Sequence, residues 1–385
     1  MKRIILLLMA AVLFVPCAWA QENTAAQSGD MQAQLDRVIA GLDLSDLEMI
    51  RVPGIEGEMS IQTLVRSLAM GEMISAQDAV SDVLSIFFGA LRGLGLLMLA
   101  IMLPVLLASL LTHMLAVERD SLFALSRSVC FVLILIPVLL LVFSELEHTR
   151  QAITSMTQRM DKLLPVLLTL LTALGGSASF AFLHPMVIAA SGSMVFLARE
   201  VTLRLVMCTC AVTAVNHLSD RAHLSRMAQL LRSVVCWLLG VSFTVFLGAM
   251  SLQGVCSASI DGVALRAAKY AVDNFVPVVG GMFSDTMDTL VGCTLIVKNA
   301  LGVAAVVVLV GAILSPMLRT LAVILVMKLS AALLEPVADA DIVQAIGDFS
   351  RTIVLFFITM LCVGTMYFLL IVQMLLVGNL TVMLR

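Results

Sequence analysis

The chain has 385 residues, of which 61% are hydrophobic and 13% charged, and its formal net charge is −3. A soluble domain carries about 25% charged residues and could not bury this much apolar surface in one core. The composition therefore excludes a soluble globular protein. It predicts an all-α polytopic membrane protein with roughly seven to nine spanning or re-entrant helices.

The first twenty residues have the pattern of a secretory signal peptide. Lys2 and Arg3 form a basic start, and residues 4–15 form an apolar run. Residues 18–20 read Ala-Trp-Ala, which is a small-x-small cleavage site. We expect residues 1–20 to be removed by cleavage. The alternative is an uncleaved first helix.

Residues 21–85 form a distinct acidic region, with eleven Asp or Glu residues against three arginines. Behind a signal peptide this region is expected outside the cytoplasm, and its few basic residues agree with that side. Ile61, Leu64 and Leu68 recur at helical spacing, which predicts short amphipathic helices. The remaining residues, 86–385, are predicted to form the polytopic transmembrane domain.

The first two spans are expected at residues 94–116 and 129–143, before a polar, amphipathic stretch at residues 145–162. Residues 163–174 are apolar but would reach only about 18 Å as a helix, which is short of a hydrocarbon core about 30 Å thick. Two glycines and a further apolar run, residues 180–198, come next. Residues 163–198 are therefore either one crossing with a broken start or a hairpin that crosses twice.

A basic segment favours the hairpin. Residues 219–233 follow a predicted span at 201–218 and hold three arginines against one acidic residue. Such an excess is typical of the cytoplasmic side. The first loop, which carries Arg119 and Arg127, lies on that same side only if residues 163–198 cross twice. Residues 234–254 then cross back.

The C-terminal part contains two long apolar stretches. Residues 301–334 would extend about 51 Å as a straight helix, which is too long for one upright span. Pro316 and Arg319 lie in the middle of this stretch. We therefore expect it to kink there or to divide. Residues 352–377 form the last predicted span, and Gln373 carries its only side-chain amide.

Polar residues interrupt the apolar pattern between residues 266 and 302. Residues 266–273 are predicted as an interfacial helix with a charged face, and Pro277 should end it. Two glycines at 280 and 281 follow, and Ser284 is predicted to cap a second helix.

Both predicted helices carry charge on one face. Carboxylates inside a membrane are costly and usually face a bundle interior or a wet cavity. We therefore predict a broken or re-entrant element that faces a channel or a partner. The alternative is an ordinary loop and helix at the membrane surface, with both aspartates of the second helix solvated. The candidate polar face consists of Arg266, Lys269, Asp273, Asp285, Asp288 and Asn299.

This stretch resembles a known family. The similarity rests on RAAKYAVDNFVPVVGGMFSDTMDTLVGCTLIVKNALGV, on LSAALLEPV and on the closing GNLTVMLR. All three resemble the stage III sporulation protein AE family, closely over roughly the last 130 residues and elsewhere in layout only.

The resemblance implies a location and a role. The protein is expected in the mother-cell membrane that surrounds the forespore, as a multi-pass component of a secretion-like channel between the two cells. The expected partners are other stage III A proteins and a forespore-side membrane protein. The resemblance assigns no catalytic residues.

Other functional classes find less support. A stand-alone secondary transporter is the alternative, because such proteins place broken helices and polar residues at the membrane midplane. An enzyme is not expected: the chain has no HExxH or GxSxG motif, and its eight cysteines and five histidines are scattered. We predict no cofactor and no metal site. The arginines at 219–233 indicate the inner face or anionic lipid rather than nucleic acid.

Overall fold

The computed structural model describes residues 76–115, 120–173, 177–218, 224–275 and 280–383. Every regular element in these ranges is helical, as the sequence predicts. The elements are α4 (Ala76–Leu115), α5 (Asp120–Ala173), α6 (Ser177–Phe196), the π-helix η2 (Leu197–Thr202), α7 (Leu203–Leu218), α8 (Ser225–Phe275), α9 (Gly280–Leu334) and α10 (Ala340–Met383). The predicted signal peptide and most of the acidic region lie outside the described residues.

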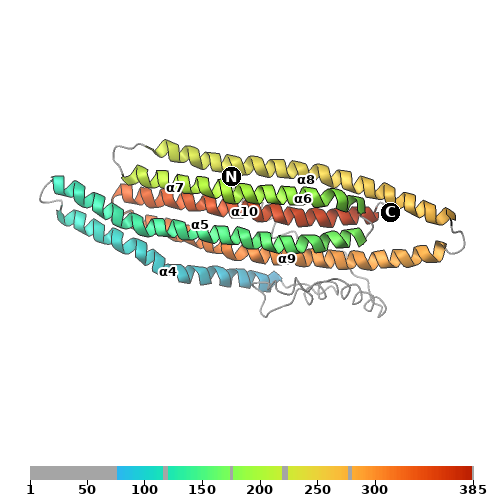
Figure 1. The fold of residues 1–385 in the computed structure, drawn as a ribbon. Helices are drawn as coiled ribbons and strands as arrows, with labels where there is room; N and C mark the ends of the chain where they lie inside the picture. Colours follow the sequence, from blue (N-terminus) through green and yellow to red (C-terminus); the bar gives the residue numbers. More distant parts are fainter. Residues whose placement is uncertain (1–75, 116–119, 174–176, 219–223, 276–279, 384–385) are drawn as a thin grey trace.

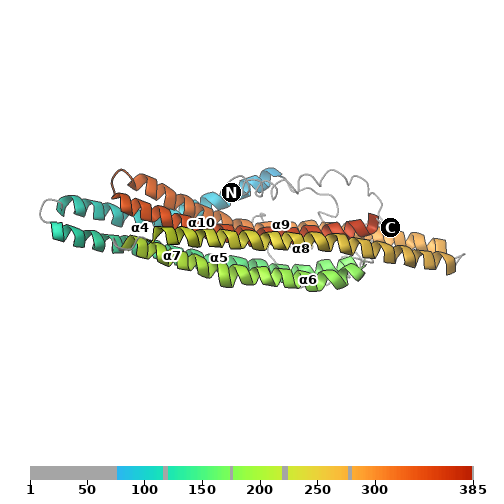
Figure 2. The same cartoon turned by 90° about the horizontal axis from the view of Figure 1, so that it is seen from above.

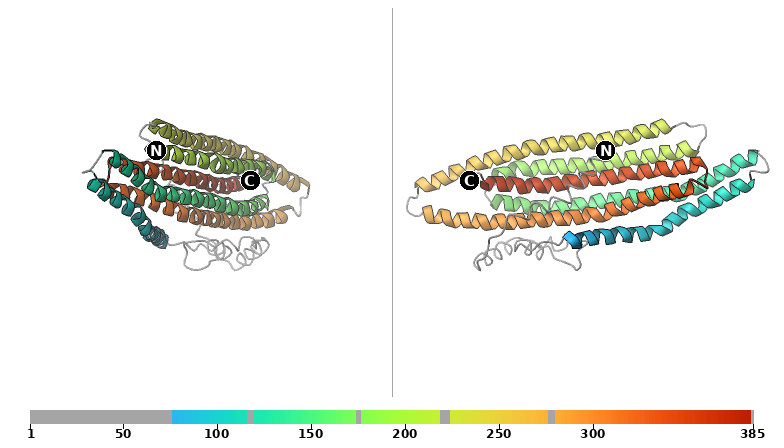
Figure 3. Two further views of the ribbon diagram at one scale, coloured as in Figure 1. Left: turned by 60° about the vertical axis from the view of Figure 1, so that its left-hand side comes forward. Right: turned by 180° about the vertical axis from the view of Figure 1, so that it is seen from behind.

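The described helices form six long rods that run alternately in opposite directions (Figures 1 and 2). The elements α6, η2 and α7 make up one of these rods. A helix satisfies its own backbone hydrogen bonds, so apolar sequences of this kind can bury their side chains against one another or against lipid. The start of α4 and the start of α8 point toward opposite ends of the bundle (Figure 3).

The rods are much longer than a bilayer is thick. The 55 residues of α9 extend about 82 Å, against a hydrocarbon core of about 30 Å. Among the described residues, five helices are long and apolar enough to cross a membrane. Their candidate spans are Val83–Leu107, Phe131–Thr169, Ser225–Leu252, Leu295–Leu334 and Ala340–Leu376. The predicted number of seven to nine is therefore not reached in this part of the chain.

Residues 163–198 belong to two antiparallel rods, as in a helical hairpin, although α6 is not among the candidate membrane spans of the described residues. α5 continues to Ala173, and α6 begins at Ser177 and returns along it (Figure 1). Of the two outcomes expected at Pro316, a kink or a division, the division is wrong, because α9 is continuous through that proline. A proline removes one backbone hydrogen bond, and packing on neighbouring helices compensates for that loss in a bundle.

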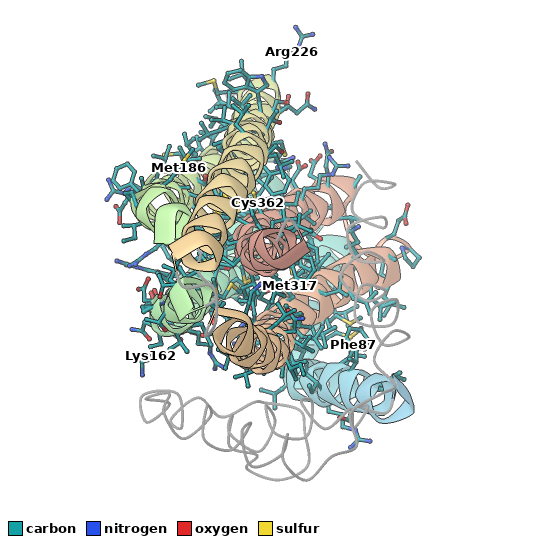
Figure 4. The ribbon with its side chains drawn as sticks, turned by 90° about the vertical axis from the view of Figure 1, so that its right-hand side faces the viewer. Phe87, Lys162, Met186, Arg226, Met317 and Cys362 are labelled. Carbon is teal, nitrogen blue, oxygen red and sulfur yellow. The ribbon has the colours of Figure 1, made fainter. Side chains whose placement is uncertain are left out.

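The last helix, α10, is the centre of the bundle. It contacts α5, α6, α7, α8 and α9. The end-on view in Figure 4 shows α10, marked by Cys362, between the other rods. Its residues Phe356, Met360, Val363 and Leu370 are completely buried. The position of each outer rod therefore depends on how it packs on α10.

Two glycines bring α9 and α10 close together. A Cβ atom at Gly302 of α9 would lie 2.0 Å from the nearest side-chain carbon of Leu375 on α10. A Cβ at Gly364 of α10 would lie 2.8 Å from Ile313 on α9. Small residues at helix contacts permit this approach inside a membrane protein. A side chain at either glycine would force Leu375 or Ile313 to shift.

Replacing Gly302 with alanine should therefore destabilise the bundle. Leu375 is buried and cannot move away freely, so Gly302→Ala should cost about 1–3 kcal/mol, as overpacking of a core usually does. The thermal unfolding midpoint of the detergent-purified chain measures the effect. Gly240→Ala on α8 is the matched control, since nothing lies within 4 Å of a Cβ there. Equal midpoints for the two variants would contradict this packing.

Candidate functional site

The predicted polar face is divided between the end of α8 and the start of α9. Arg266, Lys269 and Asp273 belong to α8, and Asp285 and Asp288 belong to α9. The backbone is helical at all five positions, and their side chains lie outside the described residues. The two helix ends project past the ends of α5, α6 and α10 as a charged helical pair (Figure 1).

The local structure of this pair differs from the prediction in two respects. α8 ends at Phe275, which confirms the predicted stop before Pro277. However, residues 266–273 are the last turns of one continuous helix, not a separate interfacial helix. α9 begins at Gly280, so the predicted cap at Ser284 is wrong.

The sixth predicted residue, Asn299, lies where the charged pair joins the bundle. Its Oδ1 atom is buried and has no hydrogen-bond partner among the described residues. The neighbouring Lys298 is completely buried, and its Nζ donates to the backbone carbonyl of Leu375 across a distance of 2.7 Å. A lysine inside an apolar bundle is expensive unless it finds such an acceptor. Lys298 therefore fixes α9 against the end of α10.

A second polar site joins three helices at the opposite end of the bundle. Asp348 of α10 accepts a hydrogen bond from Arg232 of α8, with Nη1 3.2 Å from Oδ1. Its other oxygen lies 3.2 Å from Nε2 of His217 on α7. Nη2 of Arg232 also donates to the backbone carbonyl of Asp348 and to the hydroxyl of Thr213 on α7. One arginine thus holds α7, α8 and α10 together.

The Asp348 site is largely buried. The side chain of His217 is only 8% exposed, although the residue lies next to the basic segment at residues 219–233. Asp348 lies 131 positions away in the sequence, so no local pattern could have paired the two. The only local feature that points to this site is the position of Asp348, a charged residue near the start of the strongly apolar helix α10.

A third polar contact joins the middle of α5 to the C-terminal half of α9. The completely buried carboxylate of Glu145 accepts a hydrogen bond from Thr320, with an oxygen–oxygen distance of 2.9 Å. One turn away, Nη1 of Arg319 lies 3.4 Å from Nδ1 of His148. Arg319 and Thr320, the two α9 residues of this contact, lie about one helical turn after Pro316. The contact therefore holds α9 just beyond its proline.

The described residues include no group of three or more His, Cys, Asp or Glu side chains placed to hold a metal ion. Their polar contacts instead pair one helix with another. This chemistry suits the positioning of helices in an apolar environment.

Comparison with known proteins decides the family. Residues 59–378 match the profile of the family described as stage III sporulation protein AE. The chain belongs to this family. It is also 27% identical over 399 aligned positions to the stage III sporulation protein AE of Bacillus subtilis (strain 168), with both chains covered in full. No solved structure matches. The family match extends well beyond the C-terminal residues that carry the resemblance, and it implies a role in sporulation.

The Asp348 site generates a stability prediction. Asp348→Ala leaves Arg232 and His217 largely buried without their shared acceptor, so the variant should lose about 3 kcal/mol, as a broken buried pair does. Arg351→Ala removes a third partner of the same carboxylate, but that side chain is 68% exposed. Its loss should cost under about 1 kcal/mol. Unfolding midpoints of both purified variants test the difference, and a similar loss in both would contradict it.

Proposed function

We propose that this protein is a non-enzymatic membrane component of a multi-protein channel between mother cell and forespore. It would work in the mother-cell membrane around the forespore and would be required for forespore development. The observation that carries the proposal is family membership over residues 59–378. The five helices of the described residues that are long and apolar enough to cross a membrane suit that role.

The charged helical pair supports a role in an assembly. It carries residues of both charge signs and projects from one end of the bundle (Figure 3). A charged surface of this kind can bind a polar partner, and charge complementarity would select that partner. Other stage III A proteins and a forespore-side membrane protein are the partners that we propose.

A stand-alone secondary transporter remains the second candidate. Its support in the sequence was broken helices at residues 163–198 and 275–300. The first region does divide between α5 and α6, but in the second α9 is continuous from Gly280. Glu145 is the observation that still favours it, because a buried carboxylate in a membrane bundle can bind a proton or an ion. Transport of a specific solute by the purified chain alone in vesicles would favour this candidate over the channel component.

Deletion of the gene should allow engulfment of the forespore but stop its later gene expression and growth. Purification of the tagged protein from sporulating cells should recover other stage III A proteins. The measurements are heat-resistant spore counts, a forespore-specific reporter and mass spectrometry of the purified assembly. Normal spores from the deletion strain would overturn the proposal.

Asp285→Leu and Asp288→Leu should impair the assembly without preventing membrane insertion. Each substitution removes a charge from the pair while it raises the apolar character of the helix. Spore counts and recovery of partners measure the effect, and Thr286→Leu is the control within the same turn. Unchanged spore formation in both variants and in the double variant would show that these two aspartates are merely solvated.

A further inference from the structure

The outer face of α5 is polar over five turns. Exposed polar side chains recur there at helical spacing, with the half-buried Thr154 between Gln151 and Gln158, which places them on one face of the helix. They are Ser144, Glu147, Arg150, Gln151, Gln158, Asp161 and Lys162, here called the α5 polar face. The opposite face of α5 is buried through Ile153, Met156, Met160 and Leu163. Figure 4 shows Lys162 directed away from the bundle.

The α5 polar face has the length of a membrane crossing. From Ser144 to Lys162 the helix rises about 27 Å, against a hydrocarbon core of about 30 Å. The hydroxyl of Tyr367 on α10 donates to that of Thr157 on α5 at 3.1 Å, and Glu145 is bound to Thr320 of α9. Both partners belong to candidate membrane spans. The face therefore runs alongside the apolar parts of α9 and α10.

The other side of the bundle is apolar at this level. Gln373 of α10, less than two turns beyond Tyr367, donates to the backbone carbonyl of Met250 on α8. The outward side chains of α8 near that contact include Val245 and Leu252, which are 66% and 71% exposed. Exposed aliphatic residues of a membrane helix suit lipid. Water around this whole section of the bundle would leave the exposed aliphatic side chains of α8 unexplained. Lipid around the whole section would leave the α5 polar face unexplained.

The charged residues of the α5 polar face balance in sign. Glu147 and Asp161 are negative, and Arg150 and Lys162 are positive. Copies of one membrane protein share the same orientation, so a ring of copies brings identical residues to the same height. Like charges would then face each other, and such contacts cost several kcal/mol when they are dry. Water between the copies removes this cost.

We propose that the α5 polar face lines a water-filled path enclosed by further copies of this chain, an inference that rests on the proposed channel function. The path would carry small hydrated solutes. In a ring of copies Glu147 and Asp161 form rings of negative charge, and Arg150 and Lys162 form rings of positive charge, so the path as a whole favours neither sign. The buried contacts at Glu145 and Thr157 hold the face in place near its two ends.

Thiol labelling tests this proposal. A chain without its native cysteines receives one cysteine at Gln158 or, as the matched control, at Val245, and only variants that restore spore formation are used. A charged, membrane-impermeant thiol reagent is applied to opened membranes from sporulating cells. Gln158→Cys should react about tenfold or more faster than Val245→Cys, because the reactive thiolate does not form in hydrocarbon. Gln158→Leu should also reduce heat-resistant spores, whereas Val245→Leu should not.

The second test counts the copies of this chain in the assembly. Stepwise photobleaching of a fluorescently tagged chain in the purified assembly should show more than one copy. An unreactive Gln158→Cys, equal reaction at both positions, or a single copy in the assembly would each overturn the proposal. Any of these results can occur while the deletion strain still fails to make spores, so failure of this inference is distinguishable from failure of the proposed function.

Discussion

The contact between α9 and α10 around Leu375 is the interaction on which the rest of the bundle depends. Lys298 donates to the carbonyl of Leu375, and one turn later Gly302 admits the side chain of the same residue. A buried cation needs this acceptor, and the close approach needs a glycine. The two requirements fix the lengthwise position of α10. Since α10 contacts α5, α6, α7, α8 and α9, they also fix where the other rods can pack.

Buried polar groups then determine the positions of those rods. Dispersion forces between apolar helices in lipid do not select one register strongly, because lipid chains are as apolar as the helices. A buried charge has few acceptable partners, so each of Asp348, Glu145 and Lys298 admits one arrangement. Asp348 binds both α7 and α8, while Glu145 binds α9. The apolar surface supplies most of the contact area, and the polar contacts supply its specificity.

Local features of the sequence predicted part of this structure. The apolar composition indicated the helical membrane class, Pro277 marked the end of α8, and the short apolar run at 163–174 indicated a return of the chain. The failures also have local causes. Ser284 has the chemistry of a cap and Pro316 that of a breaker, but α9 begins at Gly280 and runs unbroken through Pro316, where packing on neighbouring helices offsets the lost hydrogen bond. The pairing of His217 with Asp348 could not be predicted, because it depends on how distant helices meet. The side chains of the predicted polar face, except Asn299, lie outside the described residues.

The register between α9 and α10 can be measured directly by disulfide cross-linking in native membranes. A Cβ at Gly302 would lie 2.8 Å from Cγ of Leu375, so cysteines at these two positions come within reach of a disulfide. In a chain without its native cysteines, Gly302→Cys with Leu375→Cys should cross-link rapidly under mild oxidation. The pair Gly240→Cys with Leu375→Cys should not, because Gly240 lies on the exposed side of α8. Absence of the first cross-link in a folded, membrane-inserted chain, or equal formation of both, would contradict α10 as the fixed centre of the bundle.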